Sequence, residues 1–323
     1  MYSSILIIFI TGLVIYFSGN KFVEASSKIG DYFKLSHSVK GATLDAIAGS
    51  FPELMIAIFS VVVFKSFDVA VGTITGSALF NLLIIPSIAV FISPKVFKIS
   101  KEVIARDGMF YCMAVFAFLA ALLYSTSWGV LIPVIFLIIY FWYVRVVVRH
   151  AKEYRNQEKI KSDKDKVSIS KEFGIVFANM FLMGVASFFL TENAILLAGS
   201  LGIPAIVIAF TVVAATTSGP DAVISIVNAR KGNVDDATSG IFGSNVFDIL
   251  VGLSVPVLLT FWLTGEMVNV YFEQIEIIIG LLGATILVIY LMIEDFVLTK
   301  KEAVAMTLIY FGFLAYIVYS FVA

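Results

Sequence analysis

Apolar runs of about twenty residues recur along the whole chain, and they limit its possible folds more than any other feature. As a helix, a run of that length crosses the roughly 30 Å hydrocarbon core of a bilayer. Every backbone polar group in that core must be satisfied internally, so only helices and closed barrels span it. The runs are continuous rather than alternating, which argues against a barrel. With 60% hydrophobic and 14% charged residues, the chain is predicted to be an all-α, multi-pass membrane protein.

One long polar connection divides the apolar segments into two groups of five. It is a charged stretch over 151–171, typical of a solvated linker, and it contains no EF-hand calcium loop. We therefore expect two five-helix units, 1–150 and 172–323. The segments lie near 3–20, 38–64, 69–93, 106–124, 128–149, 172–191, 203–229, 237–263, 271–293 and 303–322.

The positions of lysine and arginine predict which side each connection faces. With the N-terminus outside, all 22 basic residues except Lys65 fall in cytoplasmic connections, as the positive-inside rule requires. The external connection around 265–276 is acidic, with Glu266, Glu273 and Glu276. The sequence therefore predicts ten transmembrane helices with both termini outside.

Two short motifs occur once in each half of the chain. GSFPE (49–53) corresponds to TSGPD (217–221), and GSALFN (76–81) corresponds to GSNVFD (243–248). The distance between the motifs differs by one residue between the halves. Because each half has an odd number of spans, the second half must enter the membrane from the opposite side. Two inverted five-helix repeats are a transporter architecture, with the site expected near the midplane where interrupted helices meet.

The motifs carry the groups that a cation site needs. Pro52 and Pro220 each remove one helical hydrogen bond, freeing carbonyls near Ala48 and Thr216. An ionised side chain at the bilayer centre costs at least about 2.5–3.5 kcal/mol, so acids placed there by a repeat indicate a function. An all-oxygen set without cysteine or histidine favours Ca²⁺ and Na⁺ over softer metals. The candidate side-chain ligands are Glu53, Asp221, Asp248, Asn81, Ser50, Ser77, Thr217, Ser218 and Ser244.

At these motifs the chain resembles the cation/calcium exchanger superfamily over nearly its whole length. Residues 41–87 and 203–256 are similar to the α-1 and α-2 repeats, in wording closest to the potassium-dependent sodium/calcium exchangers. The resemblance implies that Glu53 and Asp221 are the central ligands, flanked by the hydroxyl residues and by backbone oxygens near Ala46 and Ala214. It also implies that Asn81 and Asp248 complete the centre, with the aspartate linked to K⁺ dependence.

Three residues depart from the family pattern. Gly49 lacks the hydroxyl that many sodium/calcium exchangers have there, and Gly219 replaces a larger apolar residue. Asp45 stands where an apolar residue is usual, and its repeat partner is Val213. It is interpreted either as a water-facing acid at the inner vestibule, near Lys40, or as an extra site for a proton or second cation.

We therefore predict a secondary active antiporter that exchanges Ca²⁺ for Na⁺ by alternating access, with K⁺ as a candidate co-transported ion. The alternative is a proton-coupled exchanger or an exchanger of another divalent cation such as Mg²⁺; a cation channel and an intramembrane enzyme fit less well. Spans 1 and 6 are the expected moving parts. The predicted partners are membrane lipid and inorganic cations, with no cofactor, nucleic acid or protein partner, in a prokaryotic plasma membrane.

Overall fold

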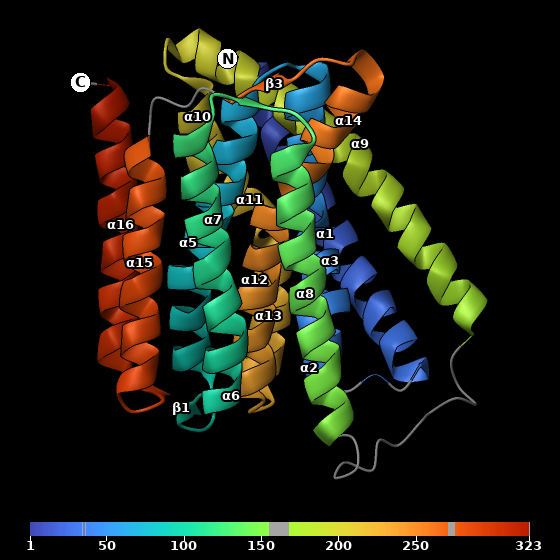
Figure 1. Cartoon of the computed structure of the whole chain (residues 1–323), viewed down its shortest axis with the longest axis vertical. Helices are drawn as coiled ribbons and strands as arrows, with labels where there is room; N and C mark the ends of the chain where they lie inside the picture. Colours follow the sequence, from blue (N-terminus) through green and yellow to red (C-terminus); the bar gives the residue numbers. More distant parts are fainter. Residues whose placement is uncertain (34, 36, 155–167, 271–274, 323) are drawn as a thin grey trace.

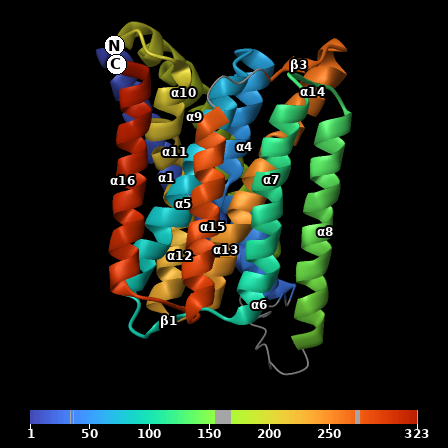
Figure 2. The ribbon, with the colours of Figure 1, turned by 60° about the vertical axis from the view of Figure 1, so that its left-hand side comes forward.

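The computed structural model describes residues 1–33, 35, 37–154, 168–270 and 275–322. Residues 155–167 of the predicted linker and Glu273 of the predicted acidic connection lie outside this part of the chain. The described residues form one bundle of long helices that run roughly along a common axis (Figure 1, Figure 2). Short antiparallel strand pairs lie at its two ends.

The first half begins with a long helix, continues through a broken one, and ends with three further membrane-length helices. Its elements are α1 (Tyr2–Tyr32), α2 (His37–Lys40), η1 (Gly41–Asp45), α3 (Ala46–Gly49), α4 (Phe51–Ile58), η2 (Phe59–Val63), α5 (Phe67–Ile92), β1 (Phe97–Lys98), α6 (Lys101–Val103), η3 (Ile104–Gly108), α7 (Met109–Tyr124), β2 (Ser127–Trp128) and α8 (Leu131–Tyr154), where η marks a π-helical segment.

The second half repeats this order. Its elements are α9 (Ile169–Leu201), α10 (Ala205–Ile208), η5 (Ala209–Val213), α11 (Ala214–Thr217), α12 (Gly219–Arg230), α13 (Val234–Phe247), η6 (Asp248–Gly252), α14 (Ser254–Thr264), β3 (Val268–Asn269), α15 (Ile275–Glu294), β4 (Val297–Leu298) and α16 (Lys300–Val322).

Among the described residues, eight helices are long and apolar enough to cross a membrane. Two further helix pairs, Gly41–Gly49 with Phe51–Val63 and Ala205–Thr217 with Gly219–Arg230, pass the same test together but are bent by 51° and 42°. Counting each bent pair as one span gives up to ten. Each of these coincides with one of the ten apolar segments, so the helical, multi-pass prediction is confirmed.

The predicted ends of the first and sixth segments were wrong. Helix α1 continues to Tyr32 rather than stopping near residue 20, and α9 runs over Ile169–Leu201 rather than 172–191. The added turns of α1 (21–32) and the first turn of α9 carry charged residues that hydrophobicity alone does not assign to a span. Lys28 near the end of α1 lies 3.8 Å from Glu172 at the start of α9. Helices α1 and α9 therefore pack against each other in opposite directions.

Each half of the chain packs its straight third helix against the broken helix of the other half. Helix α5 lies against η5 and α11, and α13 lies against η1 and α3. Glycines make both crossings close. A Cβ at Gly76 would collide with the Phe210 carbonyl oxygen, and one at Gly243 would lie 3.1 Å from the Ala42 carbonyl oxygen. These glycines occupy equivalent positions in the two motifs, so the sequence repeat is also a repeat in packing.

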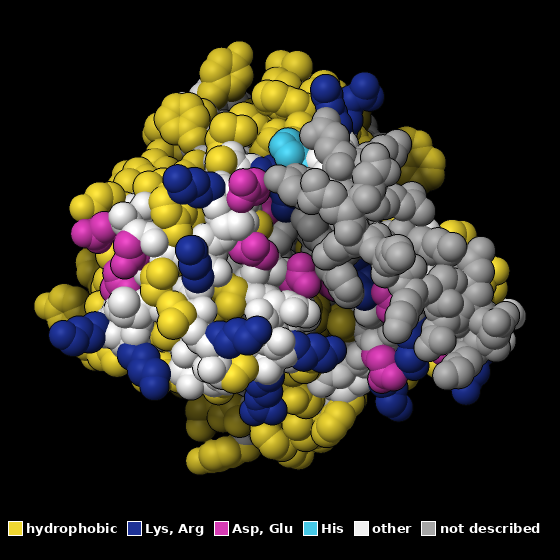
Figure 3. All heavy atoms as spheres, turned by 90° about the horizontal axis from the view of Figure 1, so that it is seen from below, with side chains coloured by type: hydrophobic (Ala, Val, Ile, Leu, Met, Phe, Trp, Pro, Cys, Tyr) yellow, Lys and Arg dark blue, Asp and Glu magenta, His cyan; other side chains and the backbone are white. Residues whose placement is uncertain are grey.

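The outer surface has the two kinds of region that a bilayer requires. Large apolar side chains are exposed along the outer helices, including Phe177, Phe181 and Phe311. A soluble protein rarely exposes so much contiguous apolar surface. Lysine and arginine gather at one end of the bundle (Figure 3). The start of α1 and the end of α16 lie together at the opposite end (Figure 2). That the basic end faces the cytoplasm, and that both termini therefore lie outside, remains a prediction. Cysteine labelling tests it directly.

We expect a cysteine at Glu266, between α14 and β3, to react with a membrane-impermeant maleimide in intact cells. A cysteine at Lys98 in β1 should react only after permeabilisation, because β1 and β3 lie at opposite ends of the bundle. Both positions are exposed, and Cys112→Ser supplies a background without other thiols. The reverse labelling pattern would mean that the predicted orientation is upside down.

Candidate functional site

The candidate site begins at two helix breaks in equivalent positions. The first broken helix is interrupted at Ser50 and the second at Ser218, and a proline follows within the first turn of the next helix. The backbone amides of both serines still bond back to Ala46 and Ala214, each over 3.0 Å. Each break thus follows one π-helical segment and one short α-helical turn. The prolines were predicted to cause this interruption, and they lie where it occurs.

The two central acids stand at the start of the helices that follow these breaks. Glu53 lies in the first turn of α4 and is 0% exposed; Asp221 lies in the first turn of α12 and is 5% exposed. A helix N-terminus carries partial positive charge and free amides, which favours a carboxylate there. Each acid accepts a hydrogen bond from α5, through Ser77 for Glu53 and through Asn81 for Asp221, so one straight helix holds both acids in the same part of the bundle. That the two acids act together as the central ligands stays a prediction.

Hydroxyl groups from the neighbouring helices hold both acids in place. Ser77 of α5 donates to Glu53 Oε1 over 3.1 Å, and Ser244 of α13 donates to Asp221 Oδ1 over 2.8 Å. These two bonds are repeat equivalents. Ser77 Oγ also lies 2.9 Å from Ser218 Oγ, which joins the first half of the site to the second.

Asn81 supplies the second link between the halves. Its side-chain amide donates to Asp221 Oδ2 over 3.0 Å and to Asn245 Oδ1 over 3.1 Å. Asn245 in turn donates to the Ala78 carbonyl oxygen over 3.1 Å. Asn245 was not among the predicted site residues. The sequence feature that could have identified Asn245 as a site residue is its place in the GSNVFD motif, between Ser244 and Asp248.

Several acceptor oxygens remain without a hydrogen-bond partner among the described residues. Asp248 is 0% exposed and starts η6, and by strict geometry neither of its carboxylate oxygens accepts a hydrogen bond, although the hydroxyls of Ser50 and Ser77 lie beside it. It interacts electrostatically with both central acids. Glu53 Oε2 and Asn81 Oδ1 are likewise buried without a strict hydrogen bond, with the Thr217 hydroxyl beside the Glu53 carboxylate. Since buried polar atoms are nearly always hydrogen-bonded, such a gathering of bare oxygens indicates a ligand site.

The remaining predicted ligands are bound within their own helix. Thr217 Oγ1 donates to the Val213 and Ala214 carbonyl oxygens over 3.2 Å each, and Ser218 Oγ donates to Ala214 over 2.8 Å. The Ala46 carbonyl accepts the Ser50 amide. The structure thus links Glu53, Ser77 and Ser218 in one buried hydrogen-bonded group and Asp221, Asn81 and Ser244 in a second, while the Ala214 carbonyl already accepts from Thr217 and Ser218.

Two departures from the family pattern have a steric reason. A Cβ at Gly49 would collide with Asp221 Oδ1, so glycine lets this backbone approach the acid of the other half. The missing hydroxyl is therefore the consequence of a close contact. A Cβ at Gly219 would lie 3.2 Å from Tyr16 Cδ2 on α1, which is tighter than ordinary contact. Gly219 gives space to the helix that packs over the break.

The centre has the chemistry of a hard-cation site. No three Asp, Glu, His or Cys side chains come close enough to hold a metal by themselves in the described part of the chain. A bound ion would therefore draw on hydroxyl, amide and carbonyl oxygens as well as carboxylates. Such flexible all-oxygen coordination suits Ca²⁺ and Na⁺. The absence of sulfur and imidazole from the set disfavours transition metals.

Buried acids on two matched helix breaks, inside a membrane-type bundle, are the arrangement of ion-coupled transporters. The chain belongs to the sodium/calcium exchanger protein family, whose model matches residues 3–149 and 171–319. It is thus a multi-pass integral membrane protein of the cation/calcium exchanger superfamily, a transporter rather than an enzyme.

The individual relatives agree with this assignment. The chain is 26% identical over 256 residues to the inner membrane protein YrbG of Escherichia coli, covering 77% of each protein. It is 36% identical over 122 residues to human sodium/potassium/calcium exchanger 3, covering 37% of this chain and 19% of that one.

Two solved structures share the fold. The sodium-calcium exchanger NCX_Mj matches with a TM-score of 0.66 at 22% identity, covering 95% of this chain and 96% of that one. The H⁺/Ca²⁺ exchanger CAX matches with a TM-score of 0.80 at 13% identity, covering 97% and 82%.

We expect Gly49→Ala to destabilise the protein by about 1–3 kcal/mol, because overpacking at a close contact forces neighbouring groups to shift. The Asp221 carboxylate is the group that must move. Thermal unfolding of the purified protein measures the effect. Gly283→Ala is the matched control, since a Cβ there meets nothing within 4 Å and alanine is the better helix former. Equal melting temperatures for the two variants would contradict the proposed contact.

Proposed function

We propose that the protein is a secondary active antiporter that exchanges Ca²⁺ for Na⁺ by alternating access. The observation that carries this proposal is the pairing of Glu53 and Asp221 across the two halves. Each acid starts a helix after a break, and Ser77 and Asn81 of one straight helix join them. The ten-span count, the two inverted repeats with both termini outside, and a prokaryotic plasma membrane belong to the same proposal.

The transported cation is proposed to lie between the two breaks. Glu53, Asp221 and Asp248 would supply charge, and the serine and threonine hydroxyls with the Ala46 carbonyl would complete the oxygen shell. Among the described residues, the unpartnered oxygens of Glu53, Asp248 and Asn81 are the ones that need a ligand most. No resident cofactor is part of this proposal, since the cations are the substrates.

Electrostatics explains why such a carrier would exchange ions rather than leak them. With no cation bound, several carboxylates stand in a region of low dielectric, where each uncompensated charge costs at least about 2.5–3.5 kcal/mol. One Ca²⁺ or several Na⁺ offset that charge. Only the neutralised forms would then rearrange between the inward and outward states. The pair α1 and α9, which packs across both breaks, is the proposed moving unit.

Proton coupling is the second candidate for the coupling ion. The fold does not distinguish the two, because one structural neighbour is named for Na⁺ and the other for H⁺. The partial match to a sodium/potassium/calcium exchanger, at 36% identity, favours Na⁺. A Mg²⁺ exchanger would need the same acids but a smaller, more rigid oxygen cage.

In proteoliposomes, we expect ⁴⁵Ca²⁺ uptake to follow an outward Na⁺ gradient. Glu53→Gln or Asp221→Asn should lower uptake at least about a hundredfold, because each removes a charge that the cation must balance, on the order of 2.7 kcal/mol. Glu294→Gln is the matched control, since this acid is exposed at the end of α15. Uptake that ignored Na⁺ but followed a pH gradient would establish the proton-coupled alternative instead.

K⁺ dependence is a separate part of the prediction and has its own test. We expect K⁺ to stimulate Ca²⁺ uptake in the wild-type protein and Asp248→Asn to remove that stimulation, so that the remaining uptake no longer responds to K⁺. The physical reason is that Asp248 presents two unpartnered carboxylate oxygens beside the central acids. Uptake that is identical with and without K⁺ in the wild-type protein would show that this acid does not serve K⁺.

A further inference from the structure

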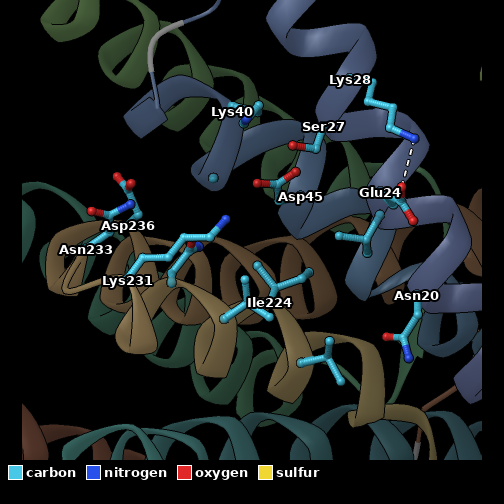
Figure 4. Close-up of a pocket in the computed structure, with 15 residues that line it drawn as sticks. Asn20, Glu24, Ser27, Lys28, Lys40, Asp45, Ile224, Lys231, Asn233 and Asp236 are labelled. Atoms are coloured by element: carbon cyan, nitrogen blue, oxygen red, sulfur yellow. Dashed lines mark hydrogen bonds and ion pairs between the residues drawn. The ribbon is translucent and has the colours of Figure 1, made fainter. Parts of the chain in front are cut away.

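Outside the three acids of the central site, one more buried acid, Asp45, lies between that site and the basic end of the bundle. Asp45, the last residue of η1, is 6% exposed although it borders a cavity of about 550 Å³. Helices α1 and α12 form the opposite walls of this cavity, and Asp45 stands between Ser27 and Ile224 (Figure 4). The sequence offered two interpretations of this acid, a water-facing acid of the inner vestibule near Lys40 or an extra site for a proton or second cation.

Two of the three lysines that line the large cavity are paired with other acids, whereas the third, Lys231, makes no ion pair within the described residues. Lys40 Nζ lies 2.9 Å from Asp31 Oδ1, and Lys28 Nζ lies 2.7 Å from Glu24 Oε1. Asp45 has no ion-pair partner within the described residues, and its Oδ1 is buried without a hydrogen bond. Lys40 acts on it only at longer range, and Asp236 and Asp31 add negative charge. Asp45 therefore lies at the inner cavity near Lys40, as the first interpretation has it, but it makes no ion pair of its own within the described residues.

Asp45 also lines a second, much smaller cavity that reaches the central site. This cavity of about 10 Å³ lies among η1, α3, α12 and α13, and Asp221 lines its other side. A volume near 10–15 Å³ holds about one water molecule, so one dehydrated cation of similar size also fits. Asp45 is thus the one carboxylate that borders both cavities among those described.

The walls of the small cavity offer further oxygen ligands. Ser225 Oγ donates its proton to the Ala237 carbonyl, and Ser244 Oγ donates to Asp221. Both serines line the cavity, and a hydroxyl that donates elsewhere keeps its lone pairs for a cation. The lining of the small cavity thus contains two carboxylates and two such hydroxyls, which are the ligand types that a hard cation takes.

We propose that Asp45 and Asp221 form an additional cation-binding position, between the inner cavity and the central acids, which holds one of the transported hard cations. This proposal rests on the proposed antiport function and extends it. A cation that arrives from the large cavity exchanges part of its water for the Asp45 carboxylate before it reaches Asp221. The equivalent position in the second half is Val213, so the added position exists on one side of the membrane only.

Equilibrium binding of ²²Na⁺ and ⁴⁵Ca²⁺ to the purified protein tests the proposal. We expect Asp45→Asn to bind one cation fewer per protein than the wild type, while the site that depends on Glu53 persists. Glu24→Gln is the matched control, because it removes a carboxylate that lines the large cavity but not the small one. Asp45→Val, which copies Val213, replaces the asparagine variant if that variant fails to fold.

Transport supplies a readout that a merely structural role would not change. In oriented proteoliposomes, Asp45→Asn should raise the half-saturating cation concentration about tenfold on the side of the large cavity and leave the other side unchanged. Wild-type stoichiometry and an unchanged half-saturating concentration on the side of the large cavity in Asp45→Asn would overturn this proposal and leave the antiport function standing. If neither protein shows cation binding that depends on Glu53, the antiport proposal fails as well.

Discussion

Negative charge held in a low-dielectric interior is the constraint on which this structure depends. Glu53 and Asp221 are inside a bundle whose outer surface is apolar, where unbalanced charge is costly. The fold moderates that cost in three ways. It breaks two helices so that each acid meets a helix N-terminus, it brings a serine to each acid, and it lets Asn81 bridge the halves. What these groups leave uncompensated is the charge that a transported cation would balance.

The breaks are tolerated because each half supports the other. A helix interrupted in a membrane must recover its freed backbone groups from neighbours or water. Here the straight helices α5 and α13 lie across the breaks of the opposite half, and Gly76 and Gly243 bring the backbones close. The repeat positions Ala78 and Asn245 bond directly to each other. Neither half could form this site alone, since Asp221 accepts a hydrogen bond from Asn81 of the first half, and Ser77, which donates to Glu53, contacts Ser218 of the second half.

The two halves are similar but not identical, and their differences lie around the centre. Asn81 corresponds to Asp248, Gly49 to Thr217, and Asp45 to Val213. The second half carries the additional acid at Asp248, and the first half carries it at Asp45. Gly49 of the first half has no side chain where the second half has Thr217, and this leaves room for Asp221. A carrier built from identical halves would present the same environment to both sides of the membrane. These substitutions give the two faces of the site different chemistry, which suits exchange between unlike ions.

The sequence by itself determined the helical membrane class, the paired motifs and the set of acids, because hydrophobic run length, repeat spacing and burial cost are local or linear properties. It misjudged the ends of α1 and α9, which continue past the apolar segments and lie against each other, with Lys28 3.8 Å from Glu172. Only the tertiary structure decided why Gly49 is glycine and where Asp45 lies relative to Asp221. Both depend on residues more than a hundred positions away, and such contacts exist only once the halves have packed.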